Sequence, residues 1–409
     1  MLDWAREHSA LLAALAKEFM RSPARRRDWQ QFYRAFQGVP PLALGDDEWI
    51  VTSWNDVRAV MGSESAELPA AYPTTGIPDI NQLLVGMLPH ETGAEHRRLR
   101  GLTMGSLSSA AIASMEQTIK RELSELLFPV AFADEGCGVR DTVGVAIPER
   151  LTCLLLDVGP EDQPSVTAWS HALYAEIGRY DQSEDEVWAA EEAYLAFHEY
   201  VLRRARDPQT QTSGSVAARL CAAHARGELG EDQLVSYFAL FLLAGQDTIT
   251  YALTNALCFL GSTPDVFTAM RERHELAGRA FAEAMRLWGP IRLVVRTMTA
   301  PFVSSGVRIG RSDRVFALLH AANRDPGHLK DPDEFRWDRD PRDSMAFGVG
   351  PHGCLGGSVG ELVGRLFFEA LGERCAALDV TPTIQEATFV DSLPILGFDD
   401  VRLFATPAA

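Results

Sequence analysis

The sequence predicts a mainly α-helical protein with small peripheral β-sheets, because helical periodicity dominates and the β-like segments are few and short. Apolar residues recur at three- and four-residue spacings, as in amphipathic helices, around 116–127, 163–206 and 231–260. Short segments rich in β-branched residues lie near 49–52, 294–299 and 315–319. The chain has no internal repeat, low-complexity tract or convincing linker, so we expect residues 1–409 to form a single domain.

Composition and charge exclude several classes of protein. An apolar fraction of 46% with 23% charged residues is ordinary for a globular chain with a large core. The formal net charge of −18 argues against nucleic-acid binding, which needs basic surface. The run 238–245 is too short to span a bilayer, and residues 1–30 predict an extra amphipathic helix rather than a signal peptide. We therefore expect a cytoplasmic protein that binds neither nucleic acid nor membranes.

The segment 231–260 is apolar almost all round, so we expect one long helix through the core. Polar and small residues interrupt it from Gly245 to Thr248. Buried polar groups are costly without partners, and a mid-helix threonine can bond back to a carbonyl and open the helix locally. The alternative, a polar stripe facing solvent, fits poorly because both flanks are apolar.

One of the six cysteines lies in an unusual setting. The chain has no C-x-x-C and no paired framework, so we expect the other five to be small buried side chains. Cys354 is part of FGVGPHGCLGG (347–357), whose five glycines would let a flat partner approach the backbone. Ser358 and Glu361 have the spacing of a capping box, which predicts a helix whose N–H groups point at the sulfur. A glycine-rich turn with a buried cysteine is the alternative, whereas a zinc site lacks ligands beyond His352.

This stretch resembles the haem-binding signature of the cytochrome P-450 family, Phe347-Gly348-x-Gly350-x-His352-x-Cys354-x-Gly356. The resemblance implies the cytochrome P-450 fold, with the Cys354 thiolate as the axial ligand to the iron of haem b. It also implies further residues that hold the haem, namely Phe347, Gly348, His352 and Gly356.

Two more motifs of the family occur in the expected order. Ala244-Gly245-Gln246-Asp247-Thr248 is similar to the oxygen-activation motif, which implies O2 as a co-substrate. By this resemblance Gly245 lies at the haem, Thr248 steadies dioxygen and its water, and Asp247 relays protons. Glu283-x-x-Arg286 is similar to the E-x-x-R pair that anchors the core beneath the haem.

The segment before the cysteine loop matches the family less completely. Phe335 and Arg339 fit the usual spacing, but Glu334 stands where an arginine is expected. The sequence therefore leaves open which arginine completes the Glu283–Arg286 cluster.

The resemblance also implies how the haem propionates are held. His96 and Arg100 are four residues apart, hence on one helix face, and together with Arg296 and His352 they would pair two buried carboxylates. A solvated basic face is the alternative for His96 and Arg100. Helical rotation then turns Arg97 and Arg98 outwards, where we expect a basic patch that docks an acidic ferredoxin.

The resemblance runs from about Tyr33 to the C-terminus and implies a monooxygenase that inserts one oxygen atom of O2 into a small organic substrate. Natural-product biosynthesis and small-molecule catabolism are both compatible roles. No flavin or nicotinamide motif is visible, so we expect electrons from a separate ferredoxin or flavodoxin. The alternatives are an atypical oxidation on the same scaffold (oxidative coupling, dealkylation or peroxygenation), a non-catalytic haem-binding or gas-sensing protein, and a non-haem metal site.

The substrate pocket is the least determined part of the prediction. By resemblance its lining includes Phe241, Ile291, Val294 and Ile395. Arg292 is a candidate anchor for an acidic substrate, because a charge amid Ile-x-Leu-Val-Val needs a partner. An arginine that faces outwards from the strand is the alternative.

Overall fold

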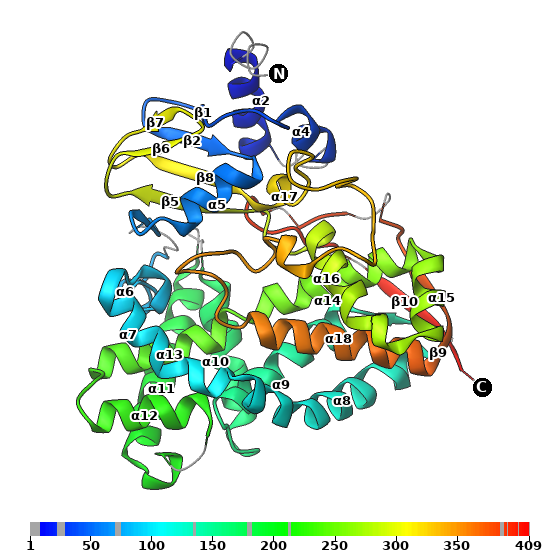
Figure 1. The fold of residues 1–409 in the computed structure, drawn as a ribbon. Coiled ribbons are helices and arrows are strands. Elements are labelled where there is room, and N and C mark those ends of the chain that lie inside the picture. The colour runs from blue at the N-terminus through cyan, green and yellow to red at the C-terminus, as the bar shows by residue number, and fades with distance from the viewer. Residues whose placement is uncertain are drawn as a thin grey trace. The chain divides into compact units, whose positions relative to one another are not determined.

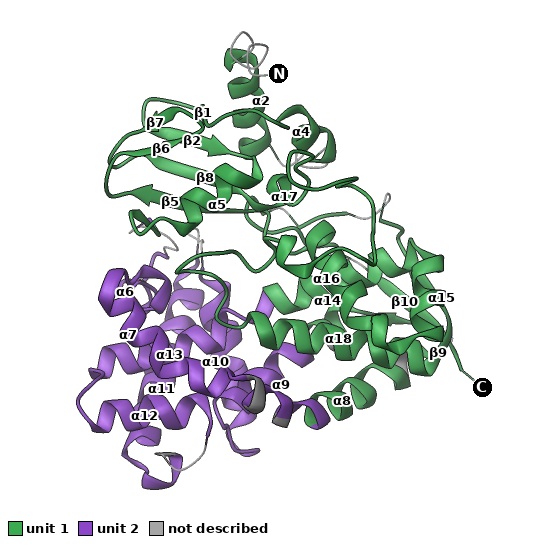
Figure 2. Cartoon of the chain, in the orientation of Figure 1, with its two compact units in different colours: residues 1–68, 118–144, 248–409 green, residues 69–117, 145–247 purple. Residues whose placement is uncertain are grey.

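The computed structural model describes residues 9–408 apart from 23–28, 70–74, 134–135, 178–181, 212–213, 385–387, 391 and 400. The chain divides into two compact units, each assembled from separate stretches of sequence (Figure 2). Unit 1 comprises Met1–Leu68, Thr118–Gly144 and Thr248–Ala409, and unit 2 comprises Pro69–Gln117 and Val145–Asp247. The prediction that the whole chain is one domain stays a prediction.

The strands of the described chain all belong to unit 1, and Figure 1 labels β1, β2, β5 and β8 of its main sheet. The main sheet has the order β1-β2-β8-β5-β3, in which only β2 and β8 run parallel. Its strands are β1 (Leu42–Ala43), β2 (Glu48–Val51), β3 (Ala66–Glu67), β5 (Leu293–Met298) and β8 (Arg314–Leu318). The three strands that the sequence predicts are thus confirmed as β2, β5 and β8, each to within one residue at both ends.

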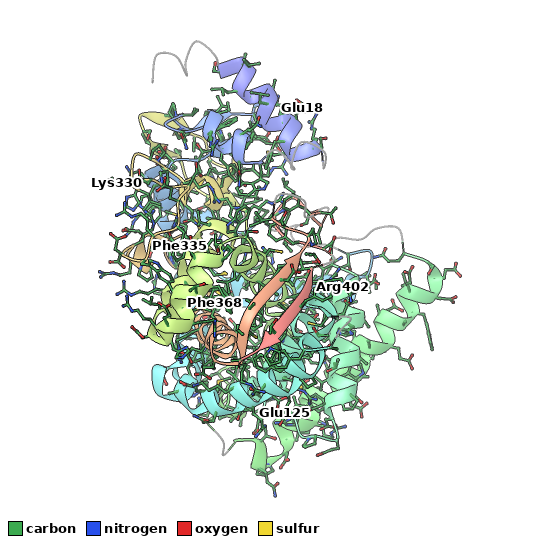
Figure 3. All side chains as sticks on the ribbon, turned by 90° about the vertical axis from the view of Figure 1, so that its right-hand side faces the viewer. Glu18, Glu125, Lys330, Phe335, Phe368 and Arg402 are labelled. Atoms are coloured by element: carbon green, nitrogen blue, oxygen red, sulfur yellow. The ribbon has the colours of Figure 1, made fainter. Side chains whose placement is uncertain are left out.

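Two smaller sheets complete the β-structure of unit 1. One has the order β4-β10-β9, and Figure 3 labels Arg402 at the start of β10. The other is the hairpin of β6 and β7. Their strands are β4 (Cys137–Gly138), β9 (Cys375–Thr381), β10 (Arg402–Pro407), β6 (Phe302–Ser304) and β7 (Val307–Ile309).

Helices cover the main sheet on both faces because strand side chains alternate between them. Along β8, Phe316 and Leu318 pack with α2 (Ser9–Arg21) and α4 (Trp29–Ala35), the N-terminal helices. Val315 and Ala317 pack instead with α5 (Trp54–Gly62). The predicted N-terminal helix is confirmed over Ser9–Arg21, while residues 1–8 and 23–28 lie outside the described residues.

The remaining helices of unit 1 lie later in the chain. They are α14 (Gln246–Gly261, whose first two residues fall in unit 2), α15 (Pro264–Glu272), η5 (His274–Leu276), α16 (Ala277–Trp288), α17 (Leu319–Ala322), η6 (Pro341–Asp343) and α18 (Gly357–Arg374). The π-helical turn η3 (Arg140–Gly144) belongs here too, and α8 (Ser109–Ala131) crosses the boundary between the units.

α16 packs closely against α18, the helix that directly follows the cysteine loop. Gly364 of α18 lies so near the Phe281 ring of α16 that an added Cβ would collide with it. Phe368, labelled in Figure 3, meets the Phe281 ring edge-on at 5.6 Å between ring centroids. The predicted capping box is wrong: α18 begins at Gly357 with Gly356 as N-cap, so Ser358 already lies inside the helix.

Unit 2 is helical throughout its described part. Its elements are α6 (Pro78–Val85), η1 (Leu88–His90), α7 (Gly93–Met104), η2 (Gly105–Leu107), α9 (Val145–Leu155), α10 (Gln163–Ala175), α11 (Glu184–Arg206), η4 (Pro208–Gln211), α12 (Val216–Ala225) and α13 (Glu231–Leu243). α13 packs against α6, α10, α11 and α12, which explains why it is apolar almost all round.

The single long helix expected over 231–260 is not continuous. α13 ends at Leu243 and α14 begins at Gln246, so Ala244 and Gly245 interrupt the helix. The interruption falls at the polar segment that the sequence singles out, but before the threonine rather than at it. The fold class, mainly α with small sheets, is confirmed.

Candidate functional site

The cysteine loop of unit 1 is closed by backbone hydrogen bonds. The Cys354 N–H donates to the Phe347 carbonyl at 2.7 Å, and the Gly348 N–H donates to the Met345 carbonyl at 2.9 Å. The Phe347 ring packs on the first turn of α18, where added Cβ atoms at Gly357 and Gly360 would lie 3.6 and 3.1 Å from it. The loop thus holds its cysteine just ahead of a helix N-terminus, where the helix dipole favours an anion such as a thiolate.

Cys354 differs from the other cysteines in its exposure. It is exposed, whereas Cys137, Cys153, Cys221, Cys258 and Cys375 are all buried, as the sequence predicts. Burial raises the pKa of each of those five thiols, to about 12 for Cys258 and Cys375. They therefore stay protonated, and the alternative of a buried Cys354 in a plain turn is wrong.

Two of the loop glycines have a reason inside the protein. Gly348 and Gly350 adopt φ of 67° and 77°, a region that L side chains rarely enter. An added Cβ at Gly350 would collide with the Met61 carbonyl oxygen and lie 2.8 Å from the Gly62 Cα, at the end of α5. Gly356 differs, because an added Cβ there meets no protein atom within 4 Å. The expectation that the loop glycines make room for a partner therefore does not explain Gly350.

The arginine that completes the Glu283–Arg286 cluster of α16 is Arg339. Arg286 donates Nε and Nη2 to the two Glu283 carboxylate oxygens at 2.7 and 2.8 Å, and Arg339 donates Nε to Oε1 at 2.9 Å. All three side chains are buried. Glu334, where an arginine is expected, contributes its carbonyl, which accepts from Arg286 at 3.1 Å. The cluster ties α16 to the segment that leads into the cysteine loop.

Arg296 of β5 is a buried cation in unit 1. Its side chain is 7% exposed, and its hydrogen bond within the described residues goes to the Val295 carbonyl at 2.8 Å. Burial lowers the pKa of this guanidinium. No carboxylate of the described chain pairs with Arg296, so a carboxylate-bearing ligand would supply the missing partner. His352, in the cysteine loop, is half-buried.

In unit 2, α7 presents His96 and Arg100 as the sequence predicts. His96 is buried, so the alternative of a solvated basic face is wrong for this residue, and Arg100 is half-buried. Burial, followed by the charges of Arg100 and Arg97, lowers the pKa of His96. Arg97 and Arg98 are exposed, but Arg98 forms an ion pair with Glu95 at 2.5 Å. That pairing neutralises part of the basic patch expected there.

The interruption after α13 exposes backbone carbonyls, and two neighbouring helices of unit 2 satisfy them. The Thr152 hydroxyl of α9 donates to the Phe241 carbonyl at 3.3 Å, and the Ser170 hydroxyl of α10 donates to the Leu242 carbonyl at 3.2 Å. Buried backbone groups need such partners wherever a helix ladder ends. Ala244 itself is exposed although Leu242 and Leu243 beside it are buried, so the interruption presents small residues and open surface.

Asp247 follows the interruption and has a specific partner. The Tyr174 hydroxyl of α10 donates to Asp247 Oδ2 at 2.6 Å. Gln246, its neighbour, donates its side-chain amide to Ser170 Oγ. Sequence reasoning missed Thr152, Ser170 and Tyr174, because hydroxyl residues in amphipathic helices carry no signal of which distant carbonyl or carboxylate they meet.

The candidate pocket residues of unit 1 include one pair in contact. Ile291 and Ile395 form an isolated antiparallel bridge, and Val294 is half-buried on β5. Arg292 is 1% exposed, with its guanidinium 5.9 Å from the centre of the Phe389 ring, so the alternative of an outward-facing arginine is wrong. Its role as a substrate anchor stays a prediction. Phe241, in unit 2, is half-buried at the end of α13.

The donor set fits a haem with an axial thiolate. Cys354 supplies an exposed sulfur ahead of a helix N-terminus, Gly356 leaves open space beside it, and Arg296 is a buried cation without a carboxylate. Within the described residues, no three His, Cys, Asp or Glu side chains cluster as a metal site, so a non-haem site gains no support there. The helices of the described chain include none long and apolar enough to cross a membrane.

Comparison with known proteins identifies the fold and the class. The family model for cytochrome P450 matches residues 271–376. The chain is 25% identical over 375 residues to the biotin biosynthesis cytochrome P450 of Bacillus subtilis (strain 168), a match that covers 89% of this chain and 92% of that protein. It is 28% identical over 348 residues to the mycinamicin IV hydroxylase/epoxidase of Micromonospora griseorubida, with 82% and 83% covered.

A solved structure gives the same result. The crystal structure of CalO2 matches with a TM-score of 0.81 at 25% identity, over 96% of this chain and 98% of that one. Fold and relatives together define a monooxygenase of the class that uses haem and dioxygen. The chain is similar over most of its length to cytochromes P450 of the bacterial type.

The backbone of the cysteine loop generates a first prediction. Gly350→Ala should lower the free energy of unfolding by about 2 kcal/mol or more, because the positive φ and the Met61 carbonyl both oppose a Cβ. Chemical unfolding measures the change. Gly45→Ala is the control, since an added Cβ there meets nothing within 4 Å, and it should shift stability by less than about 0.5 kcal/mol. Equal stability of the two variants would contradict the proposed packing of the loop on α5.

The Glu283 cluster generates a second prediction. Glu283→Gln leaves two buried guanidinium groups without a countercharge, so it should cost about 3 kcal/mol or more of unfolding free energy. Glu275→Gln is the control, because the Glu275–Arg273 ion pair is exposed and should contribute less than about 1 kcal/mol. Thermal unfolding of both variants tests this. A Glu283→Gln protein as stable as its control would show that the cluster does not hold α16 to the loop.

Proposed function

We propose that this chain is a haem-thiolate monooxygenase in which Cys354 is the axial ligand to haem b. The overall reaction would be substrate-H plus O2, two electrons and two protons, giving substrate-OH and water. The exposure of Cys354 beside the N-terminus of α18, in contrast to the five buried cysteines, is the observation that carries the proposal. When bound, the haem would supply dioxygen binding, and the electron-rich thiolate would favour O–O cleavage.

The side chains proposed to hold the haem fall into two groups. Cations and imidazoles would pair the propionates, and small or flat residues would lie against the ring. The first group is Arg296 and His352 of unit 1 with His96 and Arg100 of unit 2. The second is Phe347, Gly348, Gly356 and Gly245. The burial of Arg296 without a carboxylate supports the first group, and the open space at Gly356 supports the second.

Asp247 and Thr248 would deliver the two protons that the reaction consumes. A carboxyl group that alternates between its acid and base forms can pass protons inwards from solvent, and general acid catalysis of this kind is worth about 100-fold to 10000-fold in rate. The interruption of the helix before Gln246 supports this role, because it leaves Asp247 and Thr248 in the first turn of α14, half-buried, rather than inside an uninterrupted apolar helix.

The proposed substrate is a small organic molecule from a biosynthetic route. Relatives named for biotin biosynthesis and for mycinamicin IV hydroxylation or epoxidation support tailoring of a natural product. Phe241, Ile291, Arg292, Val294 and Ile395 are proposed to line the pocket, and the contact between Ile291 and Ile395 supports that set. Electrons would come from a separate ferredoxin or flavodoxin, as in the bacterial type of the family.

The ligand assignment yields a prediction for Cys354→Ser. The variant should lose the electron paramagnetic resonance signature of thiolate-ligated low-spin ferric haem, because serine does not supply a thiolate. Cys153→Ser, whose sulfur is buried, is the control and should keep that signature. A Cys354→Ser protein with the wild-type signature would rule out Cys354 as the ligand.

The proton-delivery role yields a prediction for Thr248→Ala. Haem content should stay at the wild-type level. A several-fold larger share of the supplied electrons should appear as hydrogen peroxide, because the Thr248 hydroxyl no longer helps to deliver protons. The control is Thr254→Val, because the Thr254 hydroxyl already donates to the Thr250 carbonyl within α14. For both variants, the measurement is the amount of hydrogen peroxide formed per electron donor oxidised. An unchanged peroxide share in Thr248→Ala would refute the role.

A further inference from the structure

α10 contacts the helix interruption with two side chains that lie one turn apart. Ser170 bonds to both ends of it, by donating to the Leu242 carbonyl and accepting from the Gln246 amide. Tyr174, four residues later, donates to Asp247. Residues four apart lie on the same helix face, so one face of α10 holds the segment 242–247. All of these residues belong to unit 2.

The Tyr174–Asp247 bond has the character of a strong interaction. An O–H donor and a carboxylate oxygen 2.6 Å apart form a short, charge-assisted hydrogen bond when the acid is ionised. Both side chains are half-buried, so water competes less for the two groups than it would at the surface. The phenol occupies Oδ2, which fixes the plane of the carboxylate and leaves Oδ1 as the oxygen that can take up and release a proton.

We propose that Tyr174 is a positioning residue that orients the Asp247 carboxylate for proton delivery. The inference rests on the proposed function, in which Asp247 relays protons. Tyr174 keeps its own proton throughout, and both protons consumed in the reaction come from solvent by way of Asp247 Oδ1. Without the phenol the carboxylate can rotate about its side-chain bonds, and the proton then arrives in the wrong place or too late.

A reaction that needs no known substrate can test this. When electrons are supplied by a surrogate ferredoxin and its reductase in the absence of substrate, O2 is reduced either to peroxide, with two electrons and two protons, or to water, with four of each. Prompt proton delivery favours water. The number of electrons consumed per O2 therefore reports proton delivery directly.

The variants are Tyr174→Phe, Asp247→Asn, the double variant, and Tyr194→Phe as a control. Tyr194 is a half-buried tyrosine of α11 whose ring contacts His198. We expect Tyr174→Phe to raise the peroxide share at least about threefold, in the direction of the larger rise from Asp247→Asn. Because Tyr174 acts through the carboxylate, the double variant should match Asp247→Asn alone, and Tyr194→Phe should match the wild type.

A second readout requires no turnover. Chemical unfolding of the wild type, Tyr174→Phe, Asp247→Asn and the double variant, each with haem bound in its ferric state, gives a double-mutant cycle for Tyr174 and Asp247. The hydrogen bond predicts that the two substitutions shift the unfolding midpoint non-additively. Additive shifts would show that the bond does not form in solution and would overturn the inference.

The outcomes separate the inference from the function beneath it. A wild-type peroxide share in Tyr174→Phe, beside a raised share in Asp247→Asn, overturns the positioning role and leaves the relay intact. An effect of Tyr174→Phe that persists undiminished in the Asp247→Asn background also overturns it, because Tyr174 would then act by another route. A wild-type share in Asp247→Asn removes the relay itself, and the inference with it.

Discussion

The hydrogen bond from the Cys354 N–H to the Phe347 carbonyl closes the cysteine loop, and the other features of unit 1 support its position. Gly350 lies against the end of α5, so the loop is anchored on the side of the main sheet. Phe347 packs on the first turn of α18, and α16 packs against α18 in turn. The sulfur is thereby held ahead of a helix N-terminus by contacts within the protein, before any ligand is considered.

The buried cluster of Glu283, Arg286 and Arg339 extends the same arrangement. A buried carboxylate with two guanidinium partners tolerates little displacement, because losing one partner leaves an uncompensated charge. Arg286 also donates to the carbonyls of Asn323, Pro332 and Glu334. One arginine of α16 thus fixes the course of the chain that leads to the loop. In unit 2, the Thr152 and Ser170 hydroxyls stabilise the interrupted helix, because they donate to backbone carbonyls at its break.

The sequence could predict features that depend on neighbouring residues, but not those that depend on contacts between residues far apart in the chain. β-Branched residues located β2, β5 and β8, and helical periodicity located α8, α10, α11, α13 and α14. Motif spacing singled out Cys354, Glu283 and Arg286. The choice of Arg339 as the second arginine of the Glu283 cluster and the partners of the break at Ala244–Gly245 could not be predicted, because both depend on residues distant in the chain. Arg339 is 56 residues from Glu283 in the chain. Tyr174 is 73 residues from Asp247, and no local pattern links them.

The central claim is that Cys354 presents a thiolate to haem iron, and the absorption spectrum of the reduced, carbon monoxide-bound protein tests it most directly. A thiolate ligand shifts the main band to distinctly longer wavelength than an imidazole or a water ligand does. The account predicts the long-wavelength band in the wild-type protein, at an intensity that corresponds to one haem per chain. A band at the shorter wavelength in freshly prepared, fully folded protein would contradict it.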